Sequence, residues 1–218
     1  LSQSRVAEIP GLRLPAMTGG AIGYVGYDCV RYFEPKTRRD DMKDVLEVPE
    51  SWFGLFDTII ALDHFFQKVM VITYLHVPAA DAPASALRDA YEAGRATISS
   101  MLKVLKSKDL PLPPQPPVKL DQEYTSNIGR AGYESHVTEL KKHIVTGDII
   151  QAVPSQRIAR PTTLHPFNIY RHLRTVNPSP YLFYISCADF HIVGASPELL
   201  VQKDPTTKRI INHPIAGT

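Results

Sequence analysis

This sequence contains little cysteine and no long apolar run. The two cysteines, Cys29 and Cys187, lie far apart and without the spacing of a metal-ligand or redox pair. They indicate two reduced thiols of a cytoplasmic protein rather than a disulfide framework. The longest apolar stretches are interrupted by Asp63, His64 and Lys68. None reaches the ~18 residues of a membrane span, and the first residues lack the pattern of a secretion signal.

The sequence also lacks a large excess of charge of either sign. The 24 lysines and arginines nearly balance the 22 aspartates and glutamates, which leaves a net charge of +2. No strong field therefore attracts nucleic acid or a membrane surface. The eight histidines are scattered without metal spacing, and the glycines of residues 19–26 lack the strand–glycine–helix order of a dinucleotide site. We expect no metal site wholly inside this chain.

The two ends of the chain are unusual. The sequence opens on Leu1 rather than on methionine, and it closes on a turn-forming stretch, residues 214–218. Its composition, 44% hydrophobic and 21% charged, is that of an ordinary globular protein. We interpret the sequence as a piece of a longer protein.

The N-terminal part favours sheet structure. β-Branched and aromatic residues predict a strand at residues 21–27, where glycines permit bends or close backbone approach. Residues 52–76 predict two further apolar strands. A turn near Asp63 and His64 would join these two strands as a hairpin.

One long amphipathic helix is expected next. Apolar residues recur at helical spacing from near Ala84, and the pattern ends before Asp109. Gly94 lies on the apolar face, where an interior glycine costs about 1 kcal/mol relative to alanine. The proline-rich segment at 110–117 follows, and it predicts the domain boundary.

Beyond this segment, helices and short strands alternate. Ser126 or Asn127 is expected to cap a helix over residues 131–145, which Gly147 ends. A strand over residues 148–160 is predicted next, and its proline indicates an edge or a bulge. The remaining predicted elements are a helix at 166–175 and short strands at 181–187, 190–193, 199–202 and 209–212. The mixture predicts an α+β class whose core is built from sheets.

Three polar segments are candidates for a functional site. The first is GDIIQAVPSQR, residues 147–157, in which glutamines, a serine and an arginine crowd a strand that we expect to be half buried. A satisfied polar network and a ligand-binding strand fit this spacing equally well.

The other two candidates follow later in the sequence. In GASPELL, residues 194–200, Glu198 follows a proline and precedes two leucines, so we expect it to enter a buried strand and to suit an acid role. A glutamate exposed at the start of a strand also fits. In NHPIAGT, residues 212–218, free amides and a hydroxyl suit an anion, although a plain turn explains the same residues.

Five segments, in this order, resemble the large, chorismate-using subunit of the anthranilate synthase family. They are TGGAIGYVGYDCVRYFE (18–34), GDIIQAVPSQR (147–157), NPSPYLFY (177–184), GASPELL (194–200) and HPIAGT (213–218). The resemblance covers nearly the whole chain. It implies a partial chorismate-binding fold of anthranilate synthase component I, mostly antiparallel sheets with helices packed outside.

The resemblance also implies a division of the chain. A partial N-terminal region of component I would occupy residues 1–108, and a proline-rich linker would occupy residues 109–122. The first part of a truncated chorismate-binding catalytic domain would occupy residues 123–218.

Two positions separate this family from related chorismate-using enzymes. Isochorismate- and salicylate-forming relatives carry, at the position of Gln151, a lysine that activates water for attack at C2 of chorismate. A glutamine amide lacks that basicity, so Gln151 argues for ammonia as the nucleophile. Aminodeoxychorismate synthases typically carry a nucleophilic lysine at the position of Ala216, so that ammonia ends at C4. Ala216 has no nucleophile, which leaves direct addition of ammonia at C2.

The resemblance assigns roles to further residues. Glu198 matches the acid that assists departure of the C4 hydroxyl, and with Gln151 it forms the expected catalytic pair. Ala216, Gly217 and Thr218 match the substrate-binding loop, in which the last two contact the ring carboxylate of chorismate.

The resemblance also implies an inhibitor site. Tryptophan inhibits the family from a distant site, and Pro180, Leu182 and Phe183 match positions of that site. An aromatic ring beside a proline suits an indole. A place in the strand core fits Leu182 and Phe183 as well.

The family reaction would need groups that these residues lack. The glutamates that bind Mg²⁺, the catalytic histidine and the arginine that grips chorismate are expected beyond Thr218, and the Leu-Leu-Glu-Ser stretch of the inhibitor site is missing here. The resemblance implies conversion of chorismate and ammonia to anthranilate and pyruvate in tryptophan biosynthesis, with Mg²⁺ as cofactor. A glutamine amidotransferase subunit or domain would supply the ammonia, and these 218 residues alone would be inactive. An aminodeoxychorismate synthase and a non-catalytic tryptophan-binding module are the alternatives.

Overall fold

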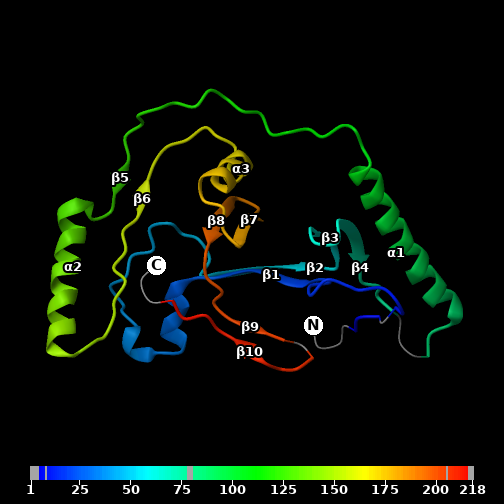
Figure 1. Cartoon of the computed structure of the whole chain (residues 1–218), viewed down its shortest axis with the longest axis horizontal. Coiled ribbons are helices and arrows are strands. Elements are labelled where there is room, and N and C mark those ends of the chain that lie inside the picture. The colour runs from blue at the N-terminus through cyan, green and yellow to red at the C-terminus, as the bar shows by residue number, and fades with distance from the viewer. Residues whose placement is uncertain (1–4, 8, 78–80, 205, 216–218) are drawn as a thin grey trace. The chain divides into compact units, whose positions relative to one another are not determined.

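The computed structural model describes residues 5–7, 9–77, 81–204 and 206–215. The chain divides into two compact units, Leu1–Pro111 and Leu112–Thr218, and each has its own helices and sheets (Figure 1). Among the described residues, every sheet is an antiparallel pair of strands. This is the expected α+β class, with helices beside small antiparallel sheets.

The first unit begins with a sheet of two strands. Strand β1 (Gly20–Val25) pairs with β2 (Ser51–Phe56), and Gly23 lies opposite Phe53. A Cβ atom at Gly23 would lie 2.8 Å from the Cα of Phe53, so this position requires a glycine. Two 3₁₀ helices follow β1: η1 (Tyr27–Tyr32) and η2 (Pro35–Thr37). The predicted strand at 21–27 is confirmed up to Val25.

A hairpin follows directly. Strands β3 (Thr58–Asp63) and β4 (Lys68–Thr73) pair in register from Thr58 opposite Thr73 to Asp63 opposite Lys68. Asp63 Oδ1 accepts hydrogen bonds from the N–H groups of Phe65 (3.0 Å) and Phe66 (2.9 Å), which fixes the turn. The predicted hairpin is therefore confirmed. The apolar run before the turn, however, forms two strands and not the single strand expected. These are β2 and β3, which belong to different sheets.

The long helix packs against this hairpin. Helix α1 (Ala84–Leu105) starts where the sequence predicts, and it contacts β4. Gly94 is buried at the contact, with Thr73 Cγ2 3.6 Å from the position of a Cβ atom and a Leu75 methyl group closer still. The interior glycine therefore permits close approach of α1 to the sheet, which compensates its low helix propensity.

The second unit begins with helix α2 (Gly129–Thr146). The hydroxyl of Ser126 accepts hydrogen bonds from the N–H groups of Ile128 (3.3 Å) and Gly129 (3.0 Å). Gly147 ends the helix with φ of 86°, a left-handed conformation that glycine adopts readily. Both predicted ends of this helix are confirmed to within two residues.

The strand predicted at 148–160 is wrong over most of its length. Only β6 (Ile158–Ala159) forms, and it pairs with β5 (Thr125–Ser126). Residues 148–157 carry no helix or strand. Pro154 cannot donate a main-chain hydrogen bond, and the segment is held at its two ends by main-chain and side-chain hydrogen bonds rather than by a ladder.

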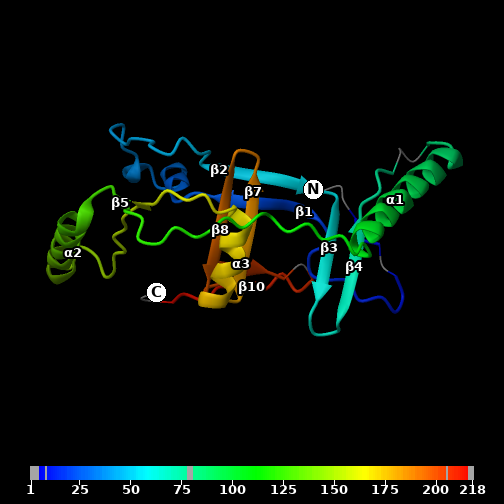
Figure 2. The same ribbon diagram turned by 90° about the horizontal axis from the view of Figure 1, so that it is seen from above.

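Helix α3 (Pro166–Val176) packs on a second hairpin, formed by β7 (Tyr181–Cys187) and β8 (Phe190–Ser196) (Figure 2). The ring of Tyr184 lies 5.5 Å from that of Phe167, edge to face, and 6.1 Å from that of Tyr170. Cys187 ends β7 with 1% of its surface exposed, and both cysteines are free. Burial, with a smaller effect of Asp189, raises the pKa of the Cys187 thiol.

The last predicted strands are shorter than expected. Strands β9 (Gln202–Lys203) and β10 (Ile210–Ile211) form one small pair. Residues 198–201, which include most of the predicted strand at 199–202, are irregular. Within the described ranges, no helix combines the length and apolar character that a membrane span requires.

Candidate active-site segments

Glu198 does not enter a buried strand as the sequence predicts. It lies in the irregular segment after β8, half-buried, because Pro197 interrupts the strand. Its main-chain N–H donates to the hydroxyl of Ser196 (3.3 Å), so a short local turn holds the residue.

The carboxylate of Glu198 contacts the segment that follows β10. The main-chain N–H of Ile215 donates to Glu198 Oε1 at 3.0 Å. Nearby, the amide of Asn212 donates to the carbonyl of Leu200. The structure thus brings together two of the three segments that the sequence identifies as candidates, although they are separated by the β9–β10 pair.

This contact has a chemical consequence. One carboxylate oxygen of Glu198 is held by an amide, and no other hydrogen bond from the described residues reaches the second oxygen. Within the described residues, the second oxygen is therefore open to a hydrogen bond with another group. Ala216, Gly217 and Thr218 continue from Ile215 but lie outside the described residues.

Gln151 lies on the irregular segment between α2 and β6, and it is exposed. Other polar side chains of this segment make structural contacts. The hydroxyl of Ser126 donates to Gln156 Oε1 (3.0 Å), and Asn127 Oδ1 accepts from the main-chain N–H of Arg157 (2.9 Å). The polar-network interpretation is thus correct for Gln156 and for the main chain at Arg157, whereas Gln151 remains available to a ligand.

The start of the same segment is held by a charged cluster at the end of α2. Asp148 Oδ2 lies 2.8 Å from His143 Nδ1 and accepts from the hydroxyl of Thr146 at 2.9 Å. These two hydrogen bonds, first from His143 and then from Thr146, hold the pKa of the Asp148 carboxyl below its ordinary value. None of these three residues is a predicted site residue, although the His–Thr–Asp spacing across a helix end offers a local signal.

The three residues matched to an inhibitor site lie at the start of β7. Pro180 is exposed and precedes the strand, and Leu182 and Phe183 are adjacent within it. Adjacent strand residues point to opposite faces of a sheet. Leu182 therefore shares the face of Tyr184, which packs on α3, while the Phe183 ring covers Gly194 on the other face. A flat ligand bound on one face of the hairpin would therefore contact either Leu182 or Phe183, but not both.

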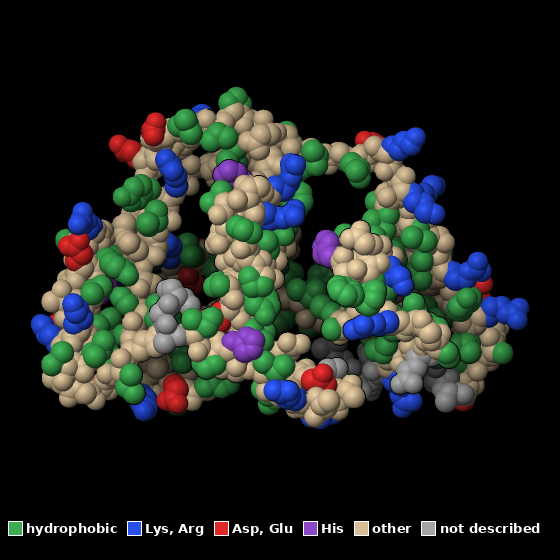
Figure 3. All heavy atoms as spheres, viewed as in Figure 1, with side chains coloured by type: hydrophobic (Ala, Val, Ile, Leu, Met, Phe, Trp, Pro, Cys, Tyr) green, Lys and Arg blue, Asp and Glu red, His purple; other side chains and the backbone are tan. Residues whose placement is uncertain are grey.

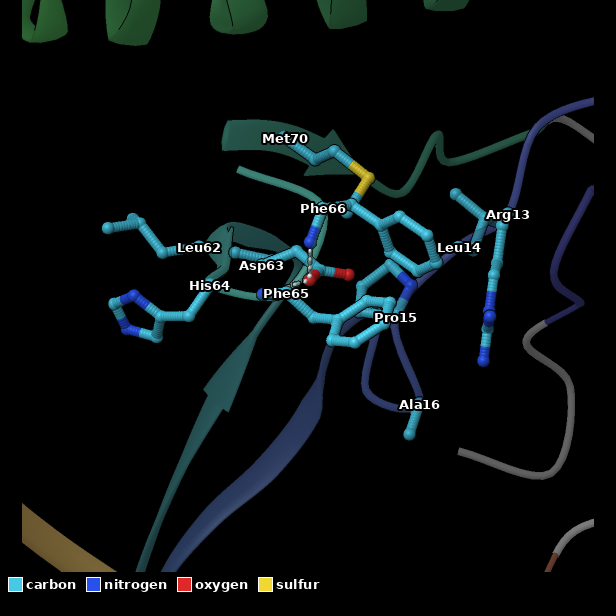
Figure 4. Close-up of a pocket in the computed structure, with 11 residues that line it drawn as sticks. Arg13, Leu14, Pro15, Ala16, Leu62, Asp63, His64, Phe65, Phe66 and Met70 are labelled. Carbon is cyan, nitrogen blue, oxygen red and sulfur yellow. Dashed lines mark hydrogen bonds between the residues drawn. The ribbon is translucent and has the colours of Figure 1, made fainter. Parts of the chain in front are cut away.

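A separate cavity of about 620 Å³ lies in the first unit (Figure 4). Residues 13–16 form one side, and the β3–β4 turn with Phe65 and Phe66 forms the other. The Arg13 guanidinium lies 5.4 Å from the centroid of the Phe66 ring. No local pattern of residues predicts this cavity, because residues far apart in the chain build it. It contains none of the predicted site residues.

The described residues do not supply a ligand set for Mg²⁺. Within that part of the chain, no three histidine, cysteine, aspartate or glutamate side chains gather in a way that could hold a metal ion. Oε1 of Glu198 accepts a hydrogen bond from a main-chain amide.

Comparison with known proteins assigns the chain to a family. The family described as chorismate binding enzyme matches residues 2–218. The chain is 57% identical to anthranilate synthase component 1 of Saccharomyces cerevisiae and 51% identical to a probable anthranilate synthase component 1 of Schizosaccharomyces pombe, in both cases over its whole length. It spans 42% and 43% of those two proteins, respectively.

A solved structure agrees with the sequence matches. The crystal structure of anthranilate synthase component I from Streptococcus pneumoniae TIGR4 superposes with a TM-score of 0.68 at 29% identity. The alignment covers 92% of this chain and 42% of that one. Since the family match extends over residues 2–218 and the fold agrees, the chain belongs to the chorismate binding enzyme family.

Proposed function

We propose that the protein to which this chain belongs is an anthranilate synthase large subunit, which converts chorismate and ammonia to anthranilate, pyruvate and water. The hydrogen bond between Ile215 N–H and Glu198 Oε1 is the observation that supports the proposal, because it joins the proposed acid to the segment matched to substrate binding. The identity of 57% to a component 1 protein supports the same reaction.

Gln151 would act on the incoming ammonia, and Glu198 would act on the departing C4 hydroxyl. Ammonia forms a C–N bond at C2 of chorismate as the C4–O bond breaks, and the free oxygen of Glu198 protonates the departing hydroxyl to water. The amide oxygen of Gln151 accepts a hydrogen bond from ammonia and orients it, without the basicity needed to activate water. Loss of the C2 proton and of the enolpyruvyl group then gives an aromatic ring and pyruvate.

The substrate would be held by the segment that continues from Ile215. Free amides and a hydroxyl at Ala216, Gly217 and Thr218 suit the ring carboxylate. Mg²⁺, whose ligands we expect beyond Thr218, would supply charge neutralisation and orientation of substrate carboxylates.

Partners and regulation follow from the same proposal. Ammonia would come from a glutamine amidotransferase subunit or domain. Tryptophan would inhibit by binding at residues 180–183, of which Phe183 presents the ring that faces away from α3. The residues from 123 onward would form the first part of the catalytic domain, those up to 108 a partial N-terminal region, and 109–122 the linker between them.

One experiment tests the reaction. The full-length protein, supplied with chorismate, ammonium and Mg²⁺, is expected to produce fluorescent anthranilate and one equivalent of pyruvate. Accumulation of a 4-amino product without pyruvate would identify an aminodeoxychorismate synthase instead. Tryptophan binding with no turnover of chorismate would identify a non-catalytic binding module.

A further inference from the structure

The segment that carries Gln151 is held at its two ends. At the first end, Asp148 contacts the last turn of α2; at the second, Gln156 and Arg157 contact Ser126 and Asn127. The residues between carry no helix or strand. The position of Gln151 therefore depends on the contacts that fix these ends.

The first end is held by side chain and main chain together. We call His143, Thr146 and Asp148 the α2 exit clamp. The main-chain N–H of Asp148 donates to the carbonyl of His143 at 3.0 Å, and its carboxylate accepts from the His143 ring and the Thr146 hydroxyl. Gly147, which lies inside the clamp, has no side chain to restrict its torsions.

The hydrogen bonds from His143 and Thr146 favour an anionic Asp148, and a second carboxylate lies near the other nitrogen of His143. Glu139 Oε1 lies 3.8 Å from His143 Nε2, and Lys142 holds Glu139 at 2.7 Å. The His143 ring thus lies between two carboxylates, and it donates to the nearer one, that of Asp148, at 2.8 Å. Hydrogen bonds to an ionised acceptor are about twice as strong as neutral ones.

We propose that Asp148, held by His143 and Thr146, is a positioning residue that sets the place of Gln151 in the reaction, and this inference rests on the proposed function. Gln151 follows Asp148 by three positions, a reach of about 10 Å. A rotation of about 10° at Gly147 would therefore move Gln151 by more than 1 Å at that reach, and misplacement of this size can cost about 10²-fold in rate. The second end stays fixed, so loss of the clamp displaces the segment without unfolding it.

The test uses the full-length protein with chorismate and ammonium. Asp148→Ala is expected to lower kcat about tenfold while the KM for chorismate changes less than about twofold. Asp148→Asn keeps an oxygen that accepts from Thr146 and His143, so it is expected to retain most of kcat. His136→Ala is the matched control, since His136 is an exposed histidine of the same helix outside the clamp.

Combination with Gln151→Ala separates positioning from a structural role. If the clamp acts through Gln151, Asp148→Ala lowers kcat little or not at all in the Gln151→Ala background. Equal losses in both backgrounds, or equal losses in Asp148→Asn and Asp148→Ala, would overturn the proposal. Should Asp148→Ala fail to fold, His143→Ala takes its place in the same comparison. A wild-type protein that makes no anthranilate would refute the proposed function, and the positioning role with it.

Discussion

At the scale of single residues, Glu198 combines partial burial with one oxygen bound to a main-chain amide. If it is the acid, Glu198→Gln in the full-length protein should lower kcat by about 10²–10⁴ and leave the KM for chorismate little changed. Steady-state assays of anthranilate fluorescence measure both. Glu123→Gln, an exposed position of the same unit, is the matched control. Near-normal turnover by Glu198→Gln would exclude the acid role.

Phe183 offers a ring on the face of β7 away from α3. Truncation of that ring in Phe183→Ala should weaken tryptophan inhibition about tenfold or more, equivalent to about 1.4 kcal/mol, with uninhibited turnover nearly intact. Inhibition curves measure the effect. Leu182→Ala is the comparison on the opposite face. Unchanged inhibition in a folded Phe183→Ala variant, or a loss confined to Leu182→Ala, would remove Phe183 from the inhibitor site.

At the scale of elements, the end of α2 should respond to acid. The pKa of Asp148 is lowered from its ordinary value of 3.8, so its contribution to stability is fully present above that value and is lost as the pH falls below it. Hydrogen exchange at the α2 C-terminus, compared between pH 5 and pH 3, should show this loss. Asp148→Asn should lack this part of the acid response. Identical acid responses in the wild-type protein and in Asp148→Asn would contradict the predicted contribution of Asp148.

The elements that sequence analysis predicted well are those with a local signal. Helices α1 and α2 follow the 3.6-residue period, and Ser126 and Gly147 mark the ends of α2. The β3–β4 turn is signalled by Asp63. The prediction of a strand at 148–160 was wrong because side chains of this segment form hydrogen bonds with β5 and with α2. The sequence around the segment does not predict these contacts.

Sequence motifs were enough to propose the candidate site residues, but they did not predict the contacts between those residues. Motifs identified Glu198 and the segment at 212–218 separately, but the hydrogen bond from Ile215 depends on the β9–β10 turn between them. Likewise, the two-residue alternation of β7 separates Leu182 from Phe183, a consequence that follows only once the strand is known.

At the scale of the whole molecule, many apolar side chains lie at the surface (Figure 3). Ile150 is 96% exposed and Leu200 is 82% exposed, and both lie beside candidate site residues. The chain also spans only 42% of the Saccharomyces cerevisiae relative.

These properties predict the behaviour of the isolated 218-residue chain. It should form no detectable anthranilate from chorismate, ammonia and Mg²⁺, because we expect the Mg²⁺ ligands that would hold chorismate in register to lie beyond Thr218. It should also bind a hydrophobic dye or aggregate through open strand edges. Fluorescence assays on the purified chain measure both. Mg²⁺-dependent product above a no-protein control would show that these residues suffice.

The hydrogen bond from Ile215 to Glu198 also makes the Glu198 carboxyl group observable by magnetic resonance. An amide proton that donates to a carboxylate is deshielded, and the deshielding diminishes when the acceptor takes up a proton. The ¹⁵N–¹H resonance of Ile215 is therefore a built-in reporter of the charge on Glu198. It would follow protonation of the acid before and after substrate binds, at a nucleus that takes no part in the reaction.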